Sequence, residues 1–307
     1  MLQSYRVLIM LVICNFLWAG NFVFGKVVIA DLSPLWITFL RWLLALLFLF
    51  PLAGYLEQPN WRKALRQWPL LVAMGLFGVI FYNLILYSAL SYTTPTNASL
   101  VASLNPAVLV AASIVLYRER FSLWQFLGFV LSLCGVVSVL LNGQWERLLS
   151  LTFNQGDLLM FGAVLVWTVY SFLAKYLQSG PITATALSTT FAVVLMAPLA
   201  LSDFPQWQQL QPVTFLGIGY MVLFPSVCSF VFWNQAVLAI GASRAGIFLN
   251  LIPVFTALIG FFLGESLSVW QGLGGLLVFS GVYLTTGRFP RTRKTQSKLK
   301  VCRSSDL

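Results

Sequence analysis

Charge and histidine are scarce in this sequence of 307 residues. Charged residues make up 8% of the chain, whereas they make up about a quarter of an ordinary soluble domain. Hydrophobic residues reach 59%, and the mean hydropathy is +0.88. This composition excludes a soluble globular domain and predicts an integral membrane protein. The absence of histidine removes the commonest metal ligand and the side chain that titrates nearest neutral pH.

The chain also lacks the patterns of metal centres and enzymes. Its four cysteines show no CxxC spacing, and three of them lie in apolar runs, where a thiol behaves as a small hydrophobe. There is no phosphate-binding loop, no HExxH or GxSxG motif and no pair of acidic residues on one helix face. We therefore expect no catalytic residues, no metal and no cofactor.

The net charge of +10 raises the question of nucleic acid, but the basic residues lie in short loops and one terminal run. No helix offers a continuous basic face, so a nucleic-acid partner is not expected. The bilayer and a small-molecule substrate are the expected partners.

Ten apolar stretches are long enough to cross a bilayer, which takes about 20 residues per helix. They show no period-two alternation, and backbone groups in lipid must pair within the segment, so we predict an all-α fold. The predicted spans are 6–28, 34–56, 69–91, 96–117, 123–142, 157–178, 183–202, 213–236, 243–264 and 269–287.

The chain contains an internal repeat. Pro106 matches Pro253 at a shift of 147, and a further set of residues recurs at a shift of 146. That set consists of Glu119, Ser122, Trp124, Gln125, Leu127, Gly128, Gly135 and Val136, which match Glu265, Ser268, Trp270, Gln271, Leu273, Gly274, Gly281 and Val282. Shared apolar composition would not place Glu, Trp, Gln and Gly in register, so we interpret the chain as a duplication.

The distribution of lysine and arginine predicts the topology. If the amino terminus is cytoplasmic, fifteen of the eighteen basic residues fall on the inner side, as the positive-inside rule requires. Both termini are therefore predicted to be cytoplasmic. Each repeat has five spans, an odd number, so the second repeat is inverted relative to the first. The predicted units are a first repeat at 1–142, an outer loop at 143–156, a second repeat at 157–287 and a basic cytoplasmic tail at 288–307.

The twofold pattern of an intramembrane proline, an apolar run, an E-x-x-S-x-W-Q turn and a glycine-spaced final helix resembles the EamA repeat of the drug/metabolite transporter superfamily. The resemblance covers about 1–287. The first copy has Tyr117 and Arg118 before Glu119, where the family usually has a small residue and glycine. The resemblance implies a bundle of ten helices in two inverted repeats that moves small metabolites or drugs across the inner membrane, commonly outward, by alternating access.

Amide side chains inside the spans are candidates for a binding pocket, because an amide that faces lipid is costly. Aromatic residues lie three or four positions from some of them and share their helix face. The substrate-binding candidates are Trp18, Asn21, Asn83, Tyr87, Trp167, Tyr170, Asn234 and Asn250. The alternative is that the amides join helices and the aromatics lie at the membrane interfaces. Both interpretations stay open for each residue.

Two prolines and one arginine complete the candidates. Pro106 and Pro253 are placed near the middle of the fourth and ninth spans, where each frees a carbonyl and bends the helix. Such paired interruptions tend to mark the binding site of a transporter with repeats. Arg41 lies about 10 Å into the second span. It could bind an anionic group of a substrate, but we favour a structural tie to carbonyls at a helix end.

We therefore predict a secondary transporter of small neutral or zwitterionic metabolites, such as amino acids, that works as an exporter. A channel, or an uptake permease for a neutral solute, is the alternative, and a ligand-binding scaffold or sensor is a further one. The last helix of each repeat is expected to brace the bundle or to form a homodimer.

Overall fold

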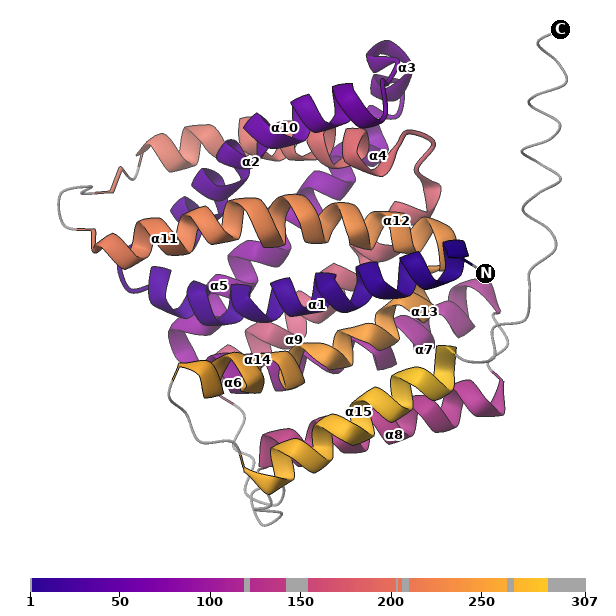
Figure 1. Cartoon of the computed structure of the whole chain (residues 1–307). Coiled ribbons are helices and arrows are strands. Elements are labelled where there is room, and N and C mark those ends of the chain that lie inside the picture. The colour runs from indigo at the N-terminus through magenta and orange to yellow at the C-terminus, as the bar shows by residue number, and fades with distance from the viewer. Residues whose placement is uncertain are drawn as a thin grey trace, which may run out of the picture.

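The computed structural model describes residues 2–118, 122–141, 154–202, 204–205, 210–263 and 268–286, and these form a bundle of helices (Figure 1). No strand occurs among them. The predicted all-helical fold is therefore confirmed. Most of the predicted connecting loop, and the whole of the predicted tail at 288–307, lie outside the described residues.

In the first repeat, helical segments cover all five predicted spans. They are α1 (Leu2–Val28), α2 (Pro34–Leu56), α3 (Trp61–Leu65), α4 (Trp68–Met74), the π-helix η1 (Gly75–Phe81), α5 (Tyr82–Tyr92), α6 (Pro95–Ala102), α7 (Asn105–Tyr117) and α8 (Leu123–Leu141). α3 belongs to the connector between the second and third spans.

The second repeat follows the same plan. Its elements are α9 (Gln155–Leu173), η3 (Ala174–Tyr176), α10 (Pro181–Ser202), α11 (Pro212–Met221), the π-helix η5 (Val222–Ser229), α12 (Phe230–Ile240), α13 (Ala242–Gly246), η6 (Ile247–Asn250), α14 (Leu251–Phe262) and α15 (Val269–Thr286). Among the described residues, seven helical stretches are long and apolar enough to span a membrane, and three shorter apolar helices lie in the fourth, fifth and tenth spans.

Regular α-helix is interrupted at equivalent places in the two repeats. The third span contains the π-helix η1, and its counterpart, the eighth span, contains the π-helix η5. The fourth span breaks between α6 and α7, and the ninth span passes through the 3₁₀ segment η6. Short π segments widen a helix locally and often occur at functional sites.

The prolines lie at these breaks rather than inside continuous bent helices. Pro106 is the second residue of α7, and Pro253 is the third residue of α14. Pro106 has no N–H for the carbonyl of Ala102, and the side-chain amide of Asn105 donates to that carbonyl instead, at 2.9 Å. The expected kink in mid-helix is thus a break just before the proline, because a polar side chain can satisfy the freed carbonyl.

The last helices of the two repeats pack against each other through glycine. A Cβ on Gly135 of α8 would lie 2.6 Å from the carbonyl oxygen of Gly274 on α15, and a Cβ on Gly281 would lie 2.5 Å from that of Gly128. Each contact is the repeat equivalent of the other. Residue numbers rise along α8 as they fall along α15, so the two helices are antiparallel and the repeats are inverted. These glycine faces are used within one chain.

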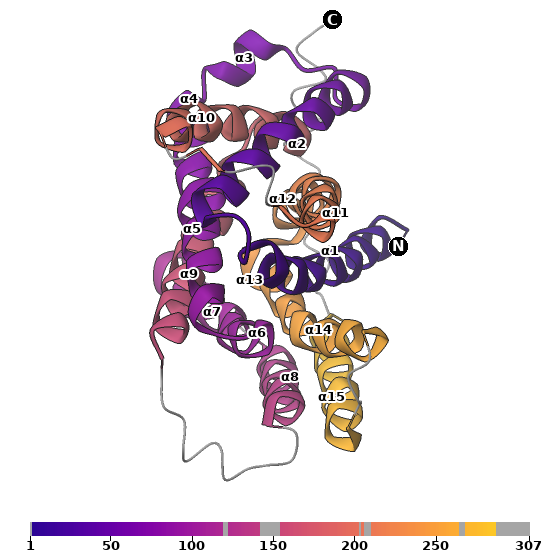
Figure 2. The same ribbon diagram turned by 90° about the vertical axis from the view of Figure 1, so that its left-hand side faces the viewer.

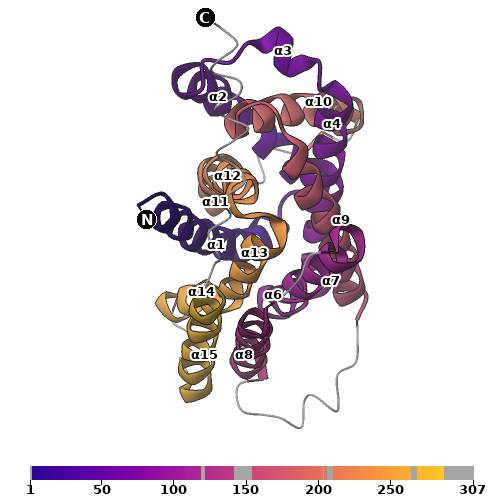
Figure 3. The same ribbon diagram turned by 90° about the vertical axis from the view of Figure 1, so that its right-hand side faces the viewer.

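The repeats interlock along the whole bundle. α2 packs on α10, α1 on α11, α12 and α14, α5 on α9, and α8 on α15. Figures 2 and 3 show the pair α2 and α10 at one end of the molecule and the pair α8 and α15 at the other. The candidate site lies between these ends, where α2 meets both π segments and α1 meets η5.

Candidate functional site

Arg41 of α2 is the buried cation at the centre of the bundle, with 1% of its surface exposed. Its Nε donates to Ser226 Oγ at 2.8 Å. Its Nη1 donates to Asn21 Oδ1 at 3.0 Å, to Asn83 Oδ1 at 3.2 Å and to the hydroxyl of Tyr87. All four acceptors are side-chain oxygens, so the expected tie to helix-end carbonyls is wrong. Ser226 belongs to the second repeat and the other three to the first, so Arg41 joins the repeats.

Hydrogen bonds to the backbone of the two π segments orient two of the acceptors of Arg41, Asn83 and Ser226. Asn83 Nδ2 donates to the carbonyls of Gly78 and Val79 in η1, at 3.1 and 2.8 Å. Ser226 Oγ donates to the carbonyl of Met221, at 2.7 Å, where η5 begins. Each polar group therefore satisfies backbone that the π segment leaves open, while its oxygen accepts from Arg41.

The second terminal nitrogen of the guanidinium is available to a ligand. Nη2 of Arg41 makes no hydrogen bond within the described part of the chain, and it is not among the fully enclosed atoms. An arginine side chain stays protonated in a protein and presents a planar fork that matches a carboxylate. Among the described residues, no salt bridge and no lining carboxylate balances this charge.

A small cavity of about 20 Å³ adjoins Arg41. A single water needs about 10–15 Å³, so the cavity has room for one water and none for a metabolite. Five of the predicted residues line it, namely Trp18, Asn21, Arg41, Asn83 and Trp167. The other lining residues are Phe22, Tyr82, Ala102, Asn105, Phe230, Leu249 and Ile252.

A cluster of aromatic rings forms one side of the cavity. Trp18 and Trp167 match between the repeats at a shift of 149, and their rings touch edge to face with centroids 5.1 Å apart. Trp233 lies 5.5 Å from both rings, and Phe230 lies 6.1 Å from Trp18 and 5.5 Å from Trp167. The contact between two equivalent residues places the pseudo-twofold axis of the repeats beside the cavity.

Two buried polar atoms of the lining have no hydrogen-bond partner, namely the indole nitrogen Nε1 of Trp167 and the amide oxygen Oδ1 of Asn105. The first is a donor and the second is an acceptor. Leaving such groups unpaired costs about 1–3 kcal/mol each. In the structure, Arg41 Nη2 is the donor open to a solute, while Trp167 Nε1 and Asn105 Oδ1 are enclosed and unpaired beside it.

The remaining predicted residues take other positions. Tyr87 donates to Asn21 Oδ1 at 3.0 Å and so supports the acceptors of Arg41. Tyr170 donates to Asn234 Oδ1 at 2.9 Å, and Asn234 donates to Thr185 at 3.1 Å, next to the aromatic cluster. Asn250 donates to Ser132 of α8 at 2.9 Å, which joins two helices outside the lining.

Sequence reasoning missed Ser226 as part of this site. Ser226 was hidden because serine is common in membrane helices, although it directly follows Pro225 inside a span. Outside the cavity lining, Lys26 donates to the carbonyls of Leu90 and Thr93, at 2.5 and 3.1 Å, where α5 ends. A cation at the carboxyl end of a helix is favoured by the helix dipole.

Comparison with known proteins identifies the family. Residues 6–141 and 154–287 each match the EamA-like transporter family. The chain belongs to this family. It is therefore a membrane transporter in class, and the fold and repeat arrangement agree with that membership. Within the described residues, no group of three His, Cys, Asp or Glu side chains could hold a metal ion.

Three relatives of the chain are themselves described as uncharacterized transporters. YyaM of Bacillus subtilis is 30% identical over 235 residues, which are 74% of this chain and 77% of YyaM. A protein of Archaeoglobus fulgidus is 30% identical over 289 residues, 91% of this chain and 97% of its own length. YhbE of Escherichia coli K12, described as an inner membrane transporter, is 24% identical and covers 86% of each chain.

One crystal structure shares the fold. Its TM-score is 0.72, and it covers 92% of this chain and 96% of its own at 22% sequence identity. Family and fold do not fix the substrate, so the solute and the direction of transport must be argued from the site.

Proposed function

We propose that this EamA-family protein is a secondary carrier that exports small zwitterionic metabolites, with amino acids or close relatives as the solute. The unbalanced guanidinium of Arg41, with Nη2 left unbonded beside the cavity, carries this proposal. A buried cation without a counter-ion is costly, and a solute carboxylate would complete the pair.

The other polar atoms of the lining support a zwitterion rather than a simple anion. Trp167 Nε1 is a second donor for the carboxylate, and Asn105 Oδ1 is an acceptor for an ammonium group. The rings of Trp18, Trp167 and Phe230 suit an apolar or aromatic side chain. A neutral amide or a cationic drug would leave the guanidinium unpaired.

The small volume of the cavity beside Arg41 favours a carrier over a channel. The 20 Å³ cavity holds no metabolite, so a solute binds only after the repeats separate on one side. Two inverted repeats around a midplane site are the arrangement that permits such rocking. A channel would need a continuous wet path through the bundle.

We place the protein in the inner membrane with both termini in the cytoplasm. The location rests on the description of YhbE, and the orientation rests on the basic residues of the connector around Arg62, Lys63 and Arg66. Export, rather than uptake, rests on what the family resemblance implies.

The metabolite content of cells that overproduce the protein tests this proposal. Extracellular and intracellular amino acids are compared between cells with the intact protein and cells with Arg41→Gln, at equal amounts in the membrane. We expect one amino-acid class to rise outside and to fall inside only with the intact protein. Arg62→Gln, which removes an exposed arginine outside the cavity, is the matched control and should export normally.

Two results would contradict the proposal. Identical amino-acid contents in cells with the intact protein and cells with Arg41→Gln would show that Arg41 has no role in export. A rise inside the cell instead of outside would replace export by uptake.

A further inference from the structure

Two carboxylates of the first repeat hold the starts of two helices of the second repeat. Glu57 follows the last residue of α2, and Asp31 precedes its first residue by three positions. Glu57 accepts from the backbone N–H of Ile182 and of Thr183, at 2.9 and 2.8 Å, and from the hydroxyl of Thr183 at 2.6 Å. These donors lie in the first turn of α10.

Asp31 makes the equivalent contacts with α11. Its Oδ2 accepts from the backbone N–H of Gln211 at 3.1 Å and from the hydroxyl of Thr214. Both helices begin with a Pro-x-Thr sequence, at 181–183 and at 212–214. In each case the threonine two residues after the proline supplies its hydroxyl to the carboxylate of the other repeat.

These carboxylates replace the caps that α10 and α11 lack in their own sequence. A helix start has unpaired N–H groups and a partial positive charge, which a local Ser, Thr, Asp or Asn usually satisfies. Gly180 precedes α10 and has no side chain, and Gln211 makes no side-chain cap bond for α11. A Cβ at position 180 would overlap the carboxyl group of Glu57, so glycine there lets the two repeats meet.

The two contacts lie at opposite faces of the membrane. α2 has 23 residues, which at 1.5 Å per residue is about 34 Å, close to the ~30 Å thickness of the hydrocarbon core. Both contacts are formed at once, and the cavity beside Arg41 has no room for a metabolite. Rocking of one repeat against the other must break one of these contacts while the other persists.

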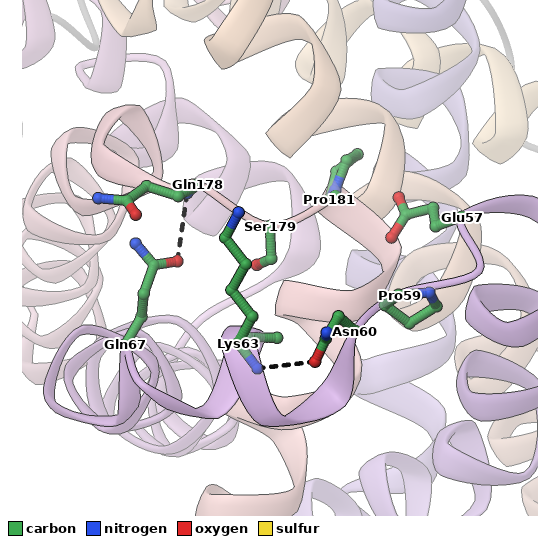
Figure 4. A pocket seen from close by; sticks show the side chains of 10 residues that line it. Glu57, Pro59, Asn60, Lys63, Gln67, Gln178, Ser179 and Pro181 are labelled. Carbon is green, nitrogen blue, oxygen red and sulfur yellow. Dashed lines mark hydrogen bonds between the residues drawn. The ribbon is translucent and has the colours of Figure 1, made fainter. Parts of the chain in front are cut away.

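On the Glu57 side, a polar cavity of about 460 Å³ lies between α3 and residues 178–181 (Figure 4). Glu57, Lys63, Gln67 and Gln178 line it. The side chain of Lys63 extends across it toward Gln178 in Figure 4, and the backbone N–H of Gln178 donates to Gln67 Oε1 at 3.2 Å. Water and charged solutes therefore reach the Glu57 contact from this face, which we call the α3 face.

We propose that Glu57 and Asp31 are the gating residues of transport, Glu57 closing the α3 face and Asp31 closing the opposite face. The proposal rests on the alternating access argued above, and it assigns each step of that cycle to one carboxylate. Breaking the Glu57 contact opens the cavity to the α3 face, and breaking the Asp31 contact opens it to the other.

Labelling of a cysteine in the cavity tests this proposal without any solute. Ala102→Cys is the reporter, in a chain whose four native cysteines are replaced by alanine. A membrane-impermeant cationic methanethiosulfonate reagent is applied separately to each face in oriented vesicles. Glu57→Gln should raise the labelling rate from the α3 face by about tenfold or more, because charge-assisted hydrogen bonds are lost, and should not raise it from the other face.

Matched variants separate gating from loosening of the fold. Asp31→Asn should give the mirror result, and Thr183→Val, which removes only one hydroxyl, should give a smaller effect on the α3 face. Asn60→Ala is the control, because Asn60 caps α3 through Lys63 N at 3.1 Å within one repeat, and it should leave both rates unchanged. Each variant is first checked for its melting temperature and elution profile.

Equal increases from both faces in Glu57→Gln and Asp31→Asn, or an Asn60→Ala result that matches Glu57→Gln, would overturn the proposal. The outcome is independent of the proposed substrate. If each variant raises labelling from one face only but no amino acid is exported, the proposed substrate class is wrong and the gating proposal is supported. If amino acids are exported but the variants raise labelling equally from both faces, the gating proposal is wrong and the proposed function is supported.

Discussion

Replacing Arg41 by glutamine should weaken the binding of amino acids far more than that of their amides. The guanidinium already gives Nε and Nη1 to neutral oxygens, and only Nη2 is left for a solute. Truncating one partner of a buried, hydrogen-bonded charge pair costs about 2–5 kcal/mol. Even the lower value corresponds to about 30-fold weaker binding. An amide carries no charge at this position and should lose about 1 kcal/mol, or about fivefold.

Thermal stabilisation of the purified protein measures this difference. The twenty proteinogenic amino acids and their amides are titrated against the intact protein, Arg41→Gln and Arg41→Lys. For an amino acid that stabilises the intact protein, Arg41→Gln should reduce the preference for acid over amide to near one. Arg41→Lys keeps the charge but loses the planar fork, so it should retain part of the preference.

The ratio of the two ligands separates binding from folding. A lower melting temperature of the ligand-free variant alone would reflect the lost contacts with Ser226, Asn21 and Asn83. Equal loss of affinity for acids and amides would show that Arg41 does not bind the carboxylate of the solute and has a structural role only.

Three further predictions follow from particular contacts. Gly281→Leu should lower the melting temperature by several degrees, because a side chain there meets the Gly128 carbonyl across α8 and α15, whereas Gly272→Leu on the open side of α15 should not. Trp18→Phe should change which amino acids are exported without reducing the amount of protein in the membrane, since Trp18 packs on Trp167 in the lining, and an unchanged profile would speak against a pocket role. The hydrogen bonds from Thr214 and from the N–H of Gln211 hold the pKa of Asp31 below its ordinary value of 3.8, so the contact stabilises the fold above that pH and is lost as pH falls through the lowered pKa. Asp31→Asn should therefore melt lower than the intact protein between pH 5 and pH 8 by a constant difference that shrinks only in acid, and a difference that varies near neutral pH would contradict this account.

The hydropathy and the internal repeat of the sequence predicted most of the fold. The second span was predicted at 34–56, and α2 has those bounds, because a long apolar run with Ser33 and Pro34 at its start is a local signal. The glycines that match between the repeats, Gly128 with Gly274 and Gly135 with Gly281, form the tight contact between α8 and α15. The odd number of spans predicted inversion.

The sequence does not predict the interruptions of the helices as directly. η1 consists of glycine and ordinary apolar residues, whereas η5 contains Pro225, which has no N–H for the carbonyl of Met221. Asn83 and Ser226 satisfy the backbone of the two segments, and Arg41 joins both of these side chains. Such a contact between residues 185 positions apart leaves no periodic trace in one sequence. The capping of α10 and α11 by Glu57 and Asp31 was missed for the same reason.

Part of the candidate site followed from spacing along single helices. Trp18 and Asn21, three residues apart, both line the cavity, as a shared helix face predicts. Asn250 shares the amide chemistry but lies against Ser132, because burial of an amide indicates a polar partner without saying which one. The roles of these residues in binding stay predictions until solute binding is measured.

Counterflow in reconstituted vesicles shows whether the protein is a carrier for amino acids with alternating access. Vesicles are loaded with an unlabelled amino acid that stabilises the protein, and uptake of a trace of the same labelled amino acid is followed without any gradient of a coupling ion. The account predicts transient accumulation of label above equilibrium with the intact protein and none with Arg41→Gln. Simple equilibration at a rate that does not depend on the unlabelled solute inside would indicate a channel and would contradict the account.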